Sequence, residues 1–145
     1  MTENRREVRT QKELTRFLSI YNRYRGLCED IRSTKEQILF LKEITEYKSP
    51  SLEGAGSSGG CYDKVGGNVG KIVDLKRALG EKEALMIDLW DQLTSMISSL
   101  SNPTERRVMT ERYINQKQWD KIAEDTNLCQ RWLFKLHKRA LQELQ

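Results

Sequence analysis

The segment 119–141 constrains the fold of this chain more than any other part of it. Ala123 is small enough for two helices to pack closely there, and Asn127 follows four positions later. A sharp turn between short helices needs one residue in the left-handed conformation, which asparagine adopts more readily than most non-glycine residues. The spacing therefore predicts a helix-turn-helix, whose second helix lies in the major groove of DNA. Six residues form its expected core: Ile122, Ala123, Asn127, Leu128, Leu133 and Leu136.

The second helix of this motif, expected at 129–144, has a cationic face and an apolar face. Basic and aromatic residues recur there at i, i+3, i+4 and i+7, opposite the leucines. An ordinary amphipathic helix with a solvated basic face is the alternative, but the alanine, turn and leucine positions independently favour the DNA-binding motif. The residues expected to read base edges are Gln130, Arg131, Phe134 and Lys135. Those expected to hold phosphates are Lys117, Gln118, Lys121, Lys138 and Arg139.

Three residues of the motif are unusual. Gln118 and Cys129 occupy the expected N-cap positions, where each costs the helix about 1 kcal/mol relative to a good cap. Trp132 borders the basic stripe, and its indole is expected to pack in the core rather than to contact a base.

The helix before the motif, expected at about 103–115, starts at a sharp boundary. Asn102 can cap it, Pro103 suits its first position, and Glu105 completes a capping-box pattern. The chain from 102 to 145 is thus expected to form a three-helix DNA-binding domain.

Two long helices are expected ahead of this domain, over about 11–48 and 62–100. The second has apolar residues in alternating three- and four-residue steps, which is a heptad pattern that only Lys82 interrupts. The first has an apolar stripe that breaks at Thr34-Lys35, where a bend or phase slip is expected. Ile87 and Trp90 widen the second stripe beyond what one partner helix covers. We therefore expect a long antiparallel hairpin that pairs with a second copy or with the C-terminal domain.

The predicted fold is thus all-α, with a helical hairpin at 11–100 followed by the three-helix domain. The charged residues 1–10 are expected to be disordered. Ser49-Pro50 ends the first helix, and a flexible Gly/Ser-rich loop is expected at about 49–61.

Composition limits the classes of protein that this chain can belong to. Of its 145 residues, 37% are hydrophobic and 32% are charged, which fits amphipathic helices with much exposed surface. Three separated cysteines suit reduced thiols in a cytoplasm, and a single histidine argues against a metal site. No long apolar run or signal peptide is present, so no membrane partner is expected. The net charge of +4 is modest, and residues 101–145 hold 9 Lys/Arg against 6 Asp/Glu.

No pattern in the sequence predicts an enzyme or a cofactor. The glycine-rich run 66–71 differs from a phosphate-binding loop in its glycine spacing and in having Ile72 where Ser or Thr is needed. His137 has no nucleophile at a known spacing, so it is expected to line the core or a phosphate. We expect a cytoplasmic, nucleoid-associated protein with no enzymatic activity, cofactor or metal.

The run from 105 to 144 resembles the promoter-binding helix-turn-helix of sigma factors (region four), and more closely the sigma-like regulators of Gram-positive prophages. The likeness rests on Arg112-Tyr113, on the step from Trp119 to Ala123, and on the ending from Leu136 to Leu141. The hairpin with a glycine-rich middle also resembles a phage family of unknown function with the same two parts in this order. The resemblance implies a phage-type transcription regulator similar to the ArpU and RinA groups.

The sequence leaves three functional hypotheses. The first is a sequence-specific regulator that binds double-stranded DNA as a homodimer, with half-sites about 34 Å apart or a multiple of that. The second is a phage packaging component of the small-terminase kind, for which a closed ring of subunits is expected. The third is an interaction protein that binds host RNA polymerase or another host factor.

Overall fold

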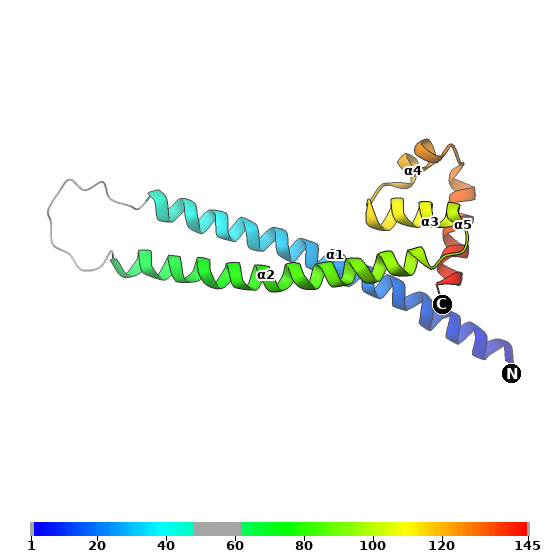
Figure 1. Cartoon of the computed structure of the whole chain (residues 1–145), viewed down its shortest axis with the longest axis horizontal. Coiled ribbons are helices and arrows are strands. Elements are labelled where there is room, and N and C mark those ends of the chain that lie inside the picture. The colour runs from blue at the N-terminus through cyan, green and yellow to red at the C-terminus, as the bar shows by residue number, and fades with distance from the viewer. Residues whose placement is uncertain (1, 48–61, 145) are drawn as a thin grey trace. The chain divides into compact units, whose positions relative to one another are not determined.

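The computed structural model describes residues 2–47 and 62–144, and the side chains of 16–47 and 66–144. Two long helices, α1 (Thr2–Tyr47) and α2 (Tyr62–Ser98), precede three shorter ones, as Figure 1 shows. The short helices are α3 (Pro103–Met109), α4 (Trp119–Thr126) and α5 (Gln130–Glu143), and a π-helical turn, η1 (Thr110–Ile114), extends α3. All regular structure in the described residues is helical, which confirms the predicted all-α class with long helices ahead of short ones. The predicted Gly/Ser loop at 49–61 lies outside the described residues.

By their contacts, the residues form two compact units. The first unit comprises residues 1–25 and 87–145, and the second comprises residues 26–86. The start of α1 thus belongs to the same unit as the C-terminal helices. The helix begins at Thr2 and so extends into the segment predicted to be disordered, where Glu and Arg favour helix formation.

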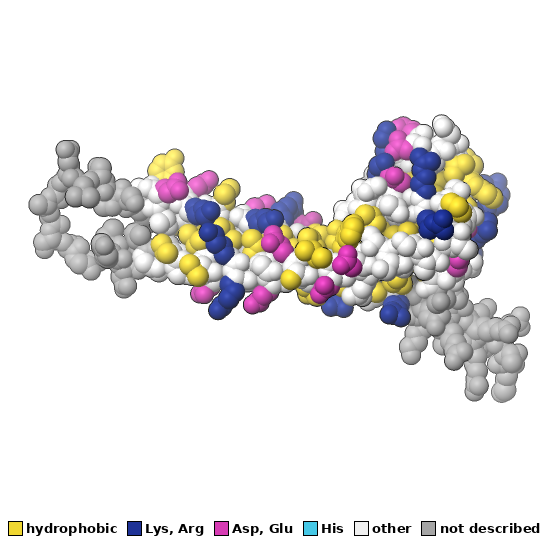
Figure 2. Space-filling model, in the orientation of Figure 1, with side chains coloured by type: hydrophobic (Ala, Val, Ile, Leu, Met, Phe, Trp, Pro, Cys, Tyr) yellow, Lys and Arg dark blue, Asp and Glu magenta, His cyan; other side chains and the backbone are white. Residues whose placement is uncertain are grey.

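Within each unit, α1 and α2 run antiparallel side by side (Figure 1), and their buried residues follow the stripes that the sequence predicted. Hydrophobic side chains gather along the line where the two helices meet (Figure 2). Every position of the predicted α2 pattern is buried or half-buried: Ile72, Leu75, Leu79, Lys82, Met86, Leu89, Leu93, Met96 and Leu100. None of the described helices is both long and apolar enough to cross a membrane.

In the second unit, the polar residue that interrupts the α1 stripe, Thr34, contacts the one that interrupts the α2 stripe, Lys82. Thr34 is buried, and its hydroxyl donates to the carbonyl of Asp30 (2.8 Å) while accepting from Nζ of Lys82 (3.1 Å). Ile31, Thr34 and Ile38 are all buried, so the stripe keeps its phase, and the expected slip is wrong. A buried polar pair of this kind favours one register of a helix pair over its neighbours.

The junction between α2 and α3 is fixed by polar contacts that position the three short helices. Asn102 is the N-cap of α3, and its Oδ1 accepts from the backbone amides of Thr104 (2.8 Å) and Glu105 (3.3 Å). The Glu143 carboxylate, at the end of α5, accepts from the backbone amide of Ser101 (2.7 Å). The start of α3 and the end of α5 are therefore both tied to this junction.

Candidate nucleic-acid interface

The α4 and α5 helices form a helix-turn-helix around a small core. Val108, Ile122, Leu133 and Leu136 are buried together, and Trp119, Ala123 and Leu128 pack against them. Asn127 ends α4 with φ 56° and ψ 30°, which is the left-handed conformation that the sequence predicted. The backbone of the turn and the packing of Ala123 together set the direction in which α5 leaves α4.

The N-caps of α4 and α5 are the weak points of this arrangement. Gln118 and Cys129 both have the extended backbone of a cap residue, but neither side chain caps its helix. Their carbonyls still accept the first helical hydrogen bonds, from Ile122 and Leu133 respectively. Since a good cap side chain contributes about 1 kcal/mol, both helix starts depend on tertiary packing.

The α5 helix separates into a buried face and an exposed face. Leu133, Leu136, Ala140 and Leu141 are buried against the rest of the first unit. The opposite face is exposed and contains Arg131, Phe134, Lys135 and Lys138. Figure 2 shows Lys and Arg side chains beside hydrophobic ones on the surface of the C-terminal helices. The four residues on the exposed face are those that the sequence placed on one stripe.

Three cations of the exposed face have no ion-pair partner within the part of the chain that the structure describes. They are Arg131, Lys135 and Lys138, which we call the open cations of α5. The nearest described aromatic contact is a loose one, with Lys135 Nζ 6.0 Å from the ring centroid of Trp132. Gln130, also exposed, donates its side-chain amide to the Asp120 carboxylate on α4. The open cations can therefore approach an anionic partner without first breaking an internal ion pair.

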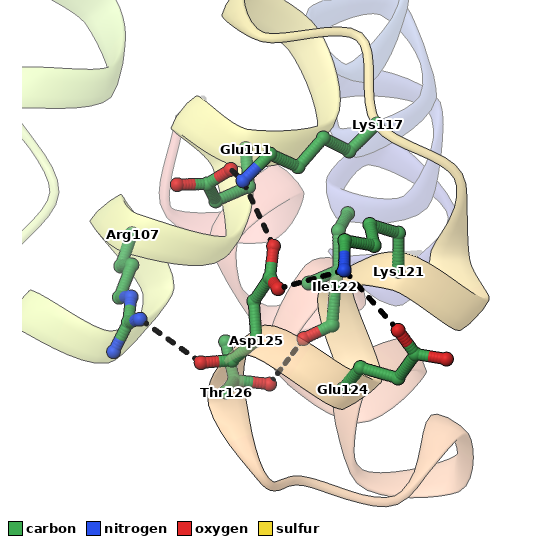
Figure 3. Close-up of polar contacts among 8 residues, drawn as sticks. All are labelled: Arg107, Glu111, Lys117, Lys121, Ile122, Glu124, Asp125 and Thr126. Carbon is green, nitrogen blue, oxygen red and sulfur yellow. Dashed lines mark hydrogen bonds and ion pairs between the residues drawn. The ribbon is translucent and has the colours of Figure 1, made fainter.

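The lysines before and within α4 are arranged differently, because they pair with carboxylates (Figure 3). Lys117 Nζ lies 2.5 Å from Glu111 Oε2 and 2.9 Å from Asp125 Oδ2, and so bridges η1 to α4. Lys121 Nζ lies 3.2 Å from Glu124 and 3.4 Å from Asp125. We call these five residues the paired network. Two of the predicted phosphate contacts thus lie in it.

Protonation in the paired network follows from these contacts. The hydrogen bond with Glu111 raises the pKa of Lys117, and the one with Glu124 raises the pKa of Lys121. The same Lys117 ammonium lowers the pKa of Glu111 and of Asp125 below their ordinary values. Lys117, Lys121, Glu111 and Asp125 are therefore charged at neutral pH, and the lysine charges are largely offset.

Arg139, another predicted phosphate contact, faces a buried carboxylate. Glu105 is 2% exposed, and its Oε1 lies 3.3 Å from Arg139 Nε. That oxygen accepts no hydrogen bond from the described residues, so the nearby guanidinium is what offsets its charge. No local pattern indicates this pair, because 33 residues lie between its two members. The remaining predicted phosphate contact, Gln118, is exposed at the start of α4.

A cluster of rings lies beneath the exposed face of α5. Tyr113 is buried, and its hydroxyl is 2.7 Å from His137 Nε2. Burial raises the pKa of Tyr113 to about 12 and lowers the pKa of His137, so both are neutral at neutral pH. Phe17 and Tyr21 of α1 contact the Tyr113 ring edge-on, at centroid distances of 4.9 and 4.7 Å. His137 thus lines the core, which is one of the two positions that the sequence predicted.

Trp119 joins this cluster to the surface. Its ring centroid lies 5.1 Å from those of both Phe134 and His137, and the guanidinium of Arg112 lies 5.1 Å above it. This role of Trp119 was not visible in the sequence, because no helical spacing relates it to Phe134. Trp132 is 43% exposed, so the expectation that it packs in the core is wrong. It lies one position before Leu133, and the turn of the helix directs it away from the buried face.

Part of the chain is similar to a known protein family. Residues 46–145 match a protein family described as "Protein of unknown function (DUF1492)". No curated protein and no solved structure matches the chain significantly. The family match covers α2, the helix-turn-helix and more than half of the chain. The chain therefore belongs to the DUF1492 family.

Proposed function

We propose that this protein is a sequence-specific, double-stranded DNA-binding regulator that inserts α5 into the major groove. One observation carries the proposal: the open cations of α5 share one exposed face, on the opposite side from the buried leucines. A recognition helix needs this division, because one side must pack on its own domain while the other meets base edges and phosphates. The resemblance of residues 105–144 to the sigma-like regulators of prophages supports a role in transcription.

The geometry favours a division of roles among the exposed residues. Arg131 and Lys135 are suited to donate to guanine O6 and N7, and Gln130 to read adenine after it leaves Asp120. Lys138, one turn further along α5, is suited to a phosphate. Lys117 and Arg139 are engaged with carboxylates, so we assign them a structural role first.

The small number of open cations favours binding as a homodimer. Even if all three reached phosphates, one copy would neutralise about three charges, whereas tight DNA binders make about 6–10 phosphate contacts. Two copies would double the number of phosphate contacts and read two half-sites. Ile87 and Trp90 of α2, which are 55% and 42% exposed, offer apolar surface for such pairing. Light scattering tests this arrangement: a dimer at micromolar concentration is expected, and a monomer would rule it out.

The proposal is tested by selecting bound duplexes from a library of random DNA with the full-length chain. We expect a recurring sequence motif, and weaker binding by an Arg131→Ala, Lys135→Ala double variant. A matched control is the Lys71→Ala, Lys76→Ala variant, which removes the same charge from exposed positions of α2. Equal affinity of the wild type and the α5 variant for the selected duplex would overturn the assignment of α5.

The same preparation distinguishes the two other functions. A closed ring of many subunits that binds DNA would favour a packaging component over a regulator. Tight binding of host RNA polymerase, without affinity for any selected duplex, would indicate an interaction protein.

A further inference from the structure

Phe134 lies on the exposed face of α5 among the three open cations. Its side chain is 47% exposed, although nearby positions of the helix on the other face are buried. It stands three positions after Arg131 and four before Lys138, so all three share a stripe. If this stripe meets DNA, the phenyl ring meets the same groove as the cations.

The ring of Phe134 is held in position by aromatic contacts within the domain. Trp119 contacts it edge-to-face, with the ring centroids 5.1 Å apart and an interplanar angle of 73°. Trp119 is in turn fixed by Arg112 above its ring and by His137, which contacts it at 5.1 Å and 76°. His137 hydrogen-bonds to the buried Tyr113. A row of contacts therefore runs from the core to Phe134, and the ring is positioned before any partner arrives.

Trp132 provides a contrast on the same helix. It is exposed to a similar extent, at 43%, but the aromatic contact that it makes with described residues is the 6.0 Å approach of Lys135. Of the two exposed aromatic residues of α5, Phe134 is thus the one with a supported orientation. Preorganised side chains lose less entropy on binding, so they are better suited to discriminate between ligands.

We propose that Phe134 contacts the 5-methyl group of a pyrimidine in the major groove, and so selects thymine or 5-methylcytosine at one position of the site. A phenyl ring can neither donate nor accept a conventional hydrogen bond, and the C5 methyl is the apolar group that base edges display in the major groove. The flanking cations bring the ring to the groove by pairing with phosphates and guanine. This inference rests on the proposed DNA-binding function.

The test uses the duplex that the wild-type chain selects from random DNA. Each thymine is replaced in turn by deoxyuridine, which removes only the methyl group, and affinity is measured by fluorescence anisotropy. Burial of one methyl predicts that affinity falls about fourfold at one thymine of each half-site. In Phe134→Ala the same replacement should have no effect, and Phe134→Leu should retain part of it.

A second arm distinguishes the two bases that carry the methyl group. The sensitive thymine–adenine pair is replaced by cytosine–guanine, with and without methylation of the cytosine. If the ring reads the methyl alone, methylation restores affinity by about the same factor of four in the wild type. If methylation has no effect there while deoxyuridine does, the contact is specific to thymine.

Trp132→Ala is the matched control, because it removes an exposed aromatic side chain from the same helix. It should retain the deoxyuridine effect even if its overall affinity changes. An equal deoxyuridine penalty in wild type and Phe134→Ala, or none at any thymine, would overturn the inference while leaving DNA binding intact. Failure to select any duplex would instead overturn the proposed function and this inference with it.

Discussion

The basic residues around α4 and those on the exposed face of α5 differ in whether they form ion pairs with carboxylates. Around α4, Lys117 and Lys121 pair with three carboxylates, whereas on α5 the three open cations have no ion-pair partner among the described residues. Composition counts all of these lysines and arginines alike. The structure therefore shows that pairing, rather than the number of basic residues, determines which surface can attract an anion.

The largest effect on stability is expected from a substitution in the core against which α4 and α5 pack. Leu133 is 0% exposed, so Leu133→Ala should lower the free energy of unfolding by roughly 2–5 kcal/mol. Urea denaturation measures the change, and Leu85→Ala, at a 43% exposed leucine of α2, is the control. An equal loss in both variants would contradict the assignment of the core.

Two arginines of α5 provide the sharpest contrast between a paired and an open cation. Arg139→Ala leaves the buried Glu105 carboxylate without its neighbouring charge, and should lower the free energy of unfolding by about 1–3 kcal/mol. Arg131→Ala removes an exposed side chain and should change the free energy of unfolding by less than about 0.5 kcal/mol. Thermal or urea unfolding of both variants checks this prediction. A larger loss of stability in Arg131→Ala than in Arg139→Ala would show that Arg139 does not have a structural role.

The same two variants should differ in the opposite direction when DNA binding is measured. Arg131→Ala is expected to cost about 1–3 kcal/mol of binding free energy and to relax sequence preference at one position. Arg139→Ala should retain the sequence preference of the wild type under conditions where it is folded. Selection from random DNA with each variant would reveal whether the preference follows Arg131.

A smaller effect is expected from the pH dependence of the paired network. The pKa values of Glu111 and Asp125 are lowered from 4.5 and 3.8, so their folded forms bind protons less tightly than the unfolded chain does. Their stabilisation is present above about pH 4.5 and is lost as the pH falls through the lowered values. Lys117→Met removes the main cause of both shifts, so stability should fall less steeply on acidification than in the wild type.

His137 must be considered in this comparison. Burial lowers its pKa from 6.5, so the unfolded chain takes up its proton first, and stability also falls as the pH drops below 6.5. Because the Lys117→Met variant retains His137, the difference between the two proteins isolates the carboxylates. Parallel pH profiles below 4.5 would contradict the pairing shown in Figure 3.

Much of the fold could be predicted because helical periodicity is a local property of sequence. The α2 pattern, the Asn102 cap and the left-handed Asn127 all depend on residues within one or two turns of each other. The π-helical turn at 110–114 was not predicted, because residues 104–115 of the expected single helix contain no proline or glycine to mark the change.

The candidate site was less predictable, because charge pairing joins residues from different helices. Glu105 with Arg139 and Thr34 with Lys82 are separated by many turns, so neither pair follows from spacing. The exposed stripe of α5 was predicted, since it depends on one helix alone. Which of its cations are open required the tertiary structure.

We propose that α5 binds DNA through its open cations while the lysines around α4 stay paired. The most direct test is the salt dependence of affinity for the selected duplex. Lys138→Ala should reduce the slope of log K against log salt by about one, and Lys117→Ala should leave it unchanged. A slope that falls in Lys117→Ala but not in Lys138→Ala would show instead that Lys117, and not the open cations of α5, contacts the phosphates.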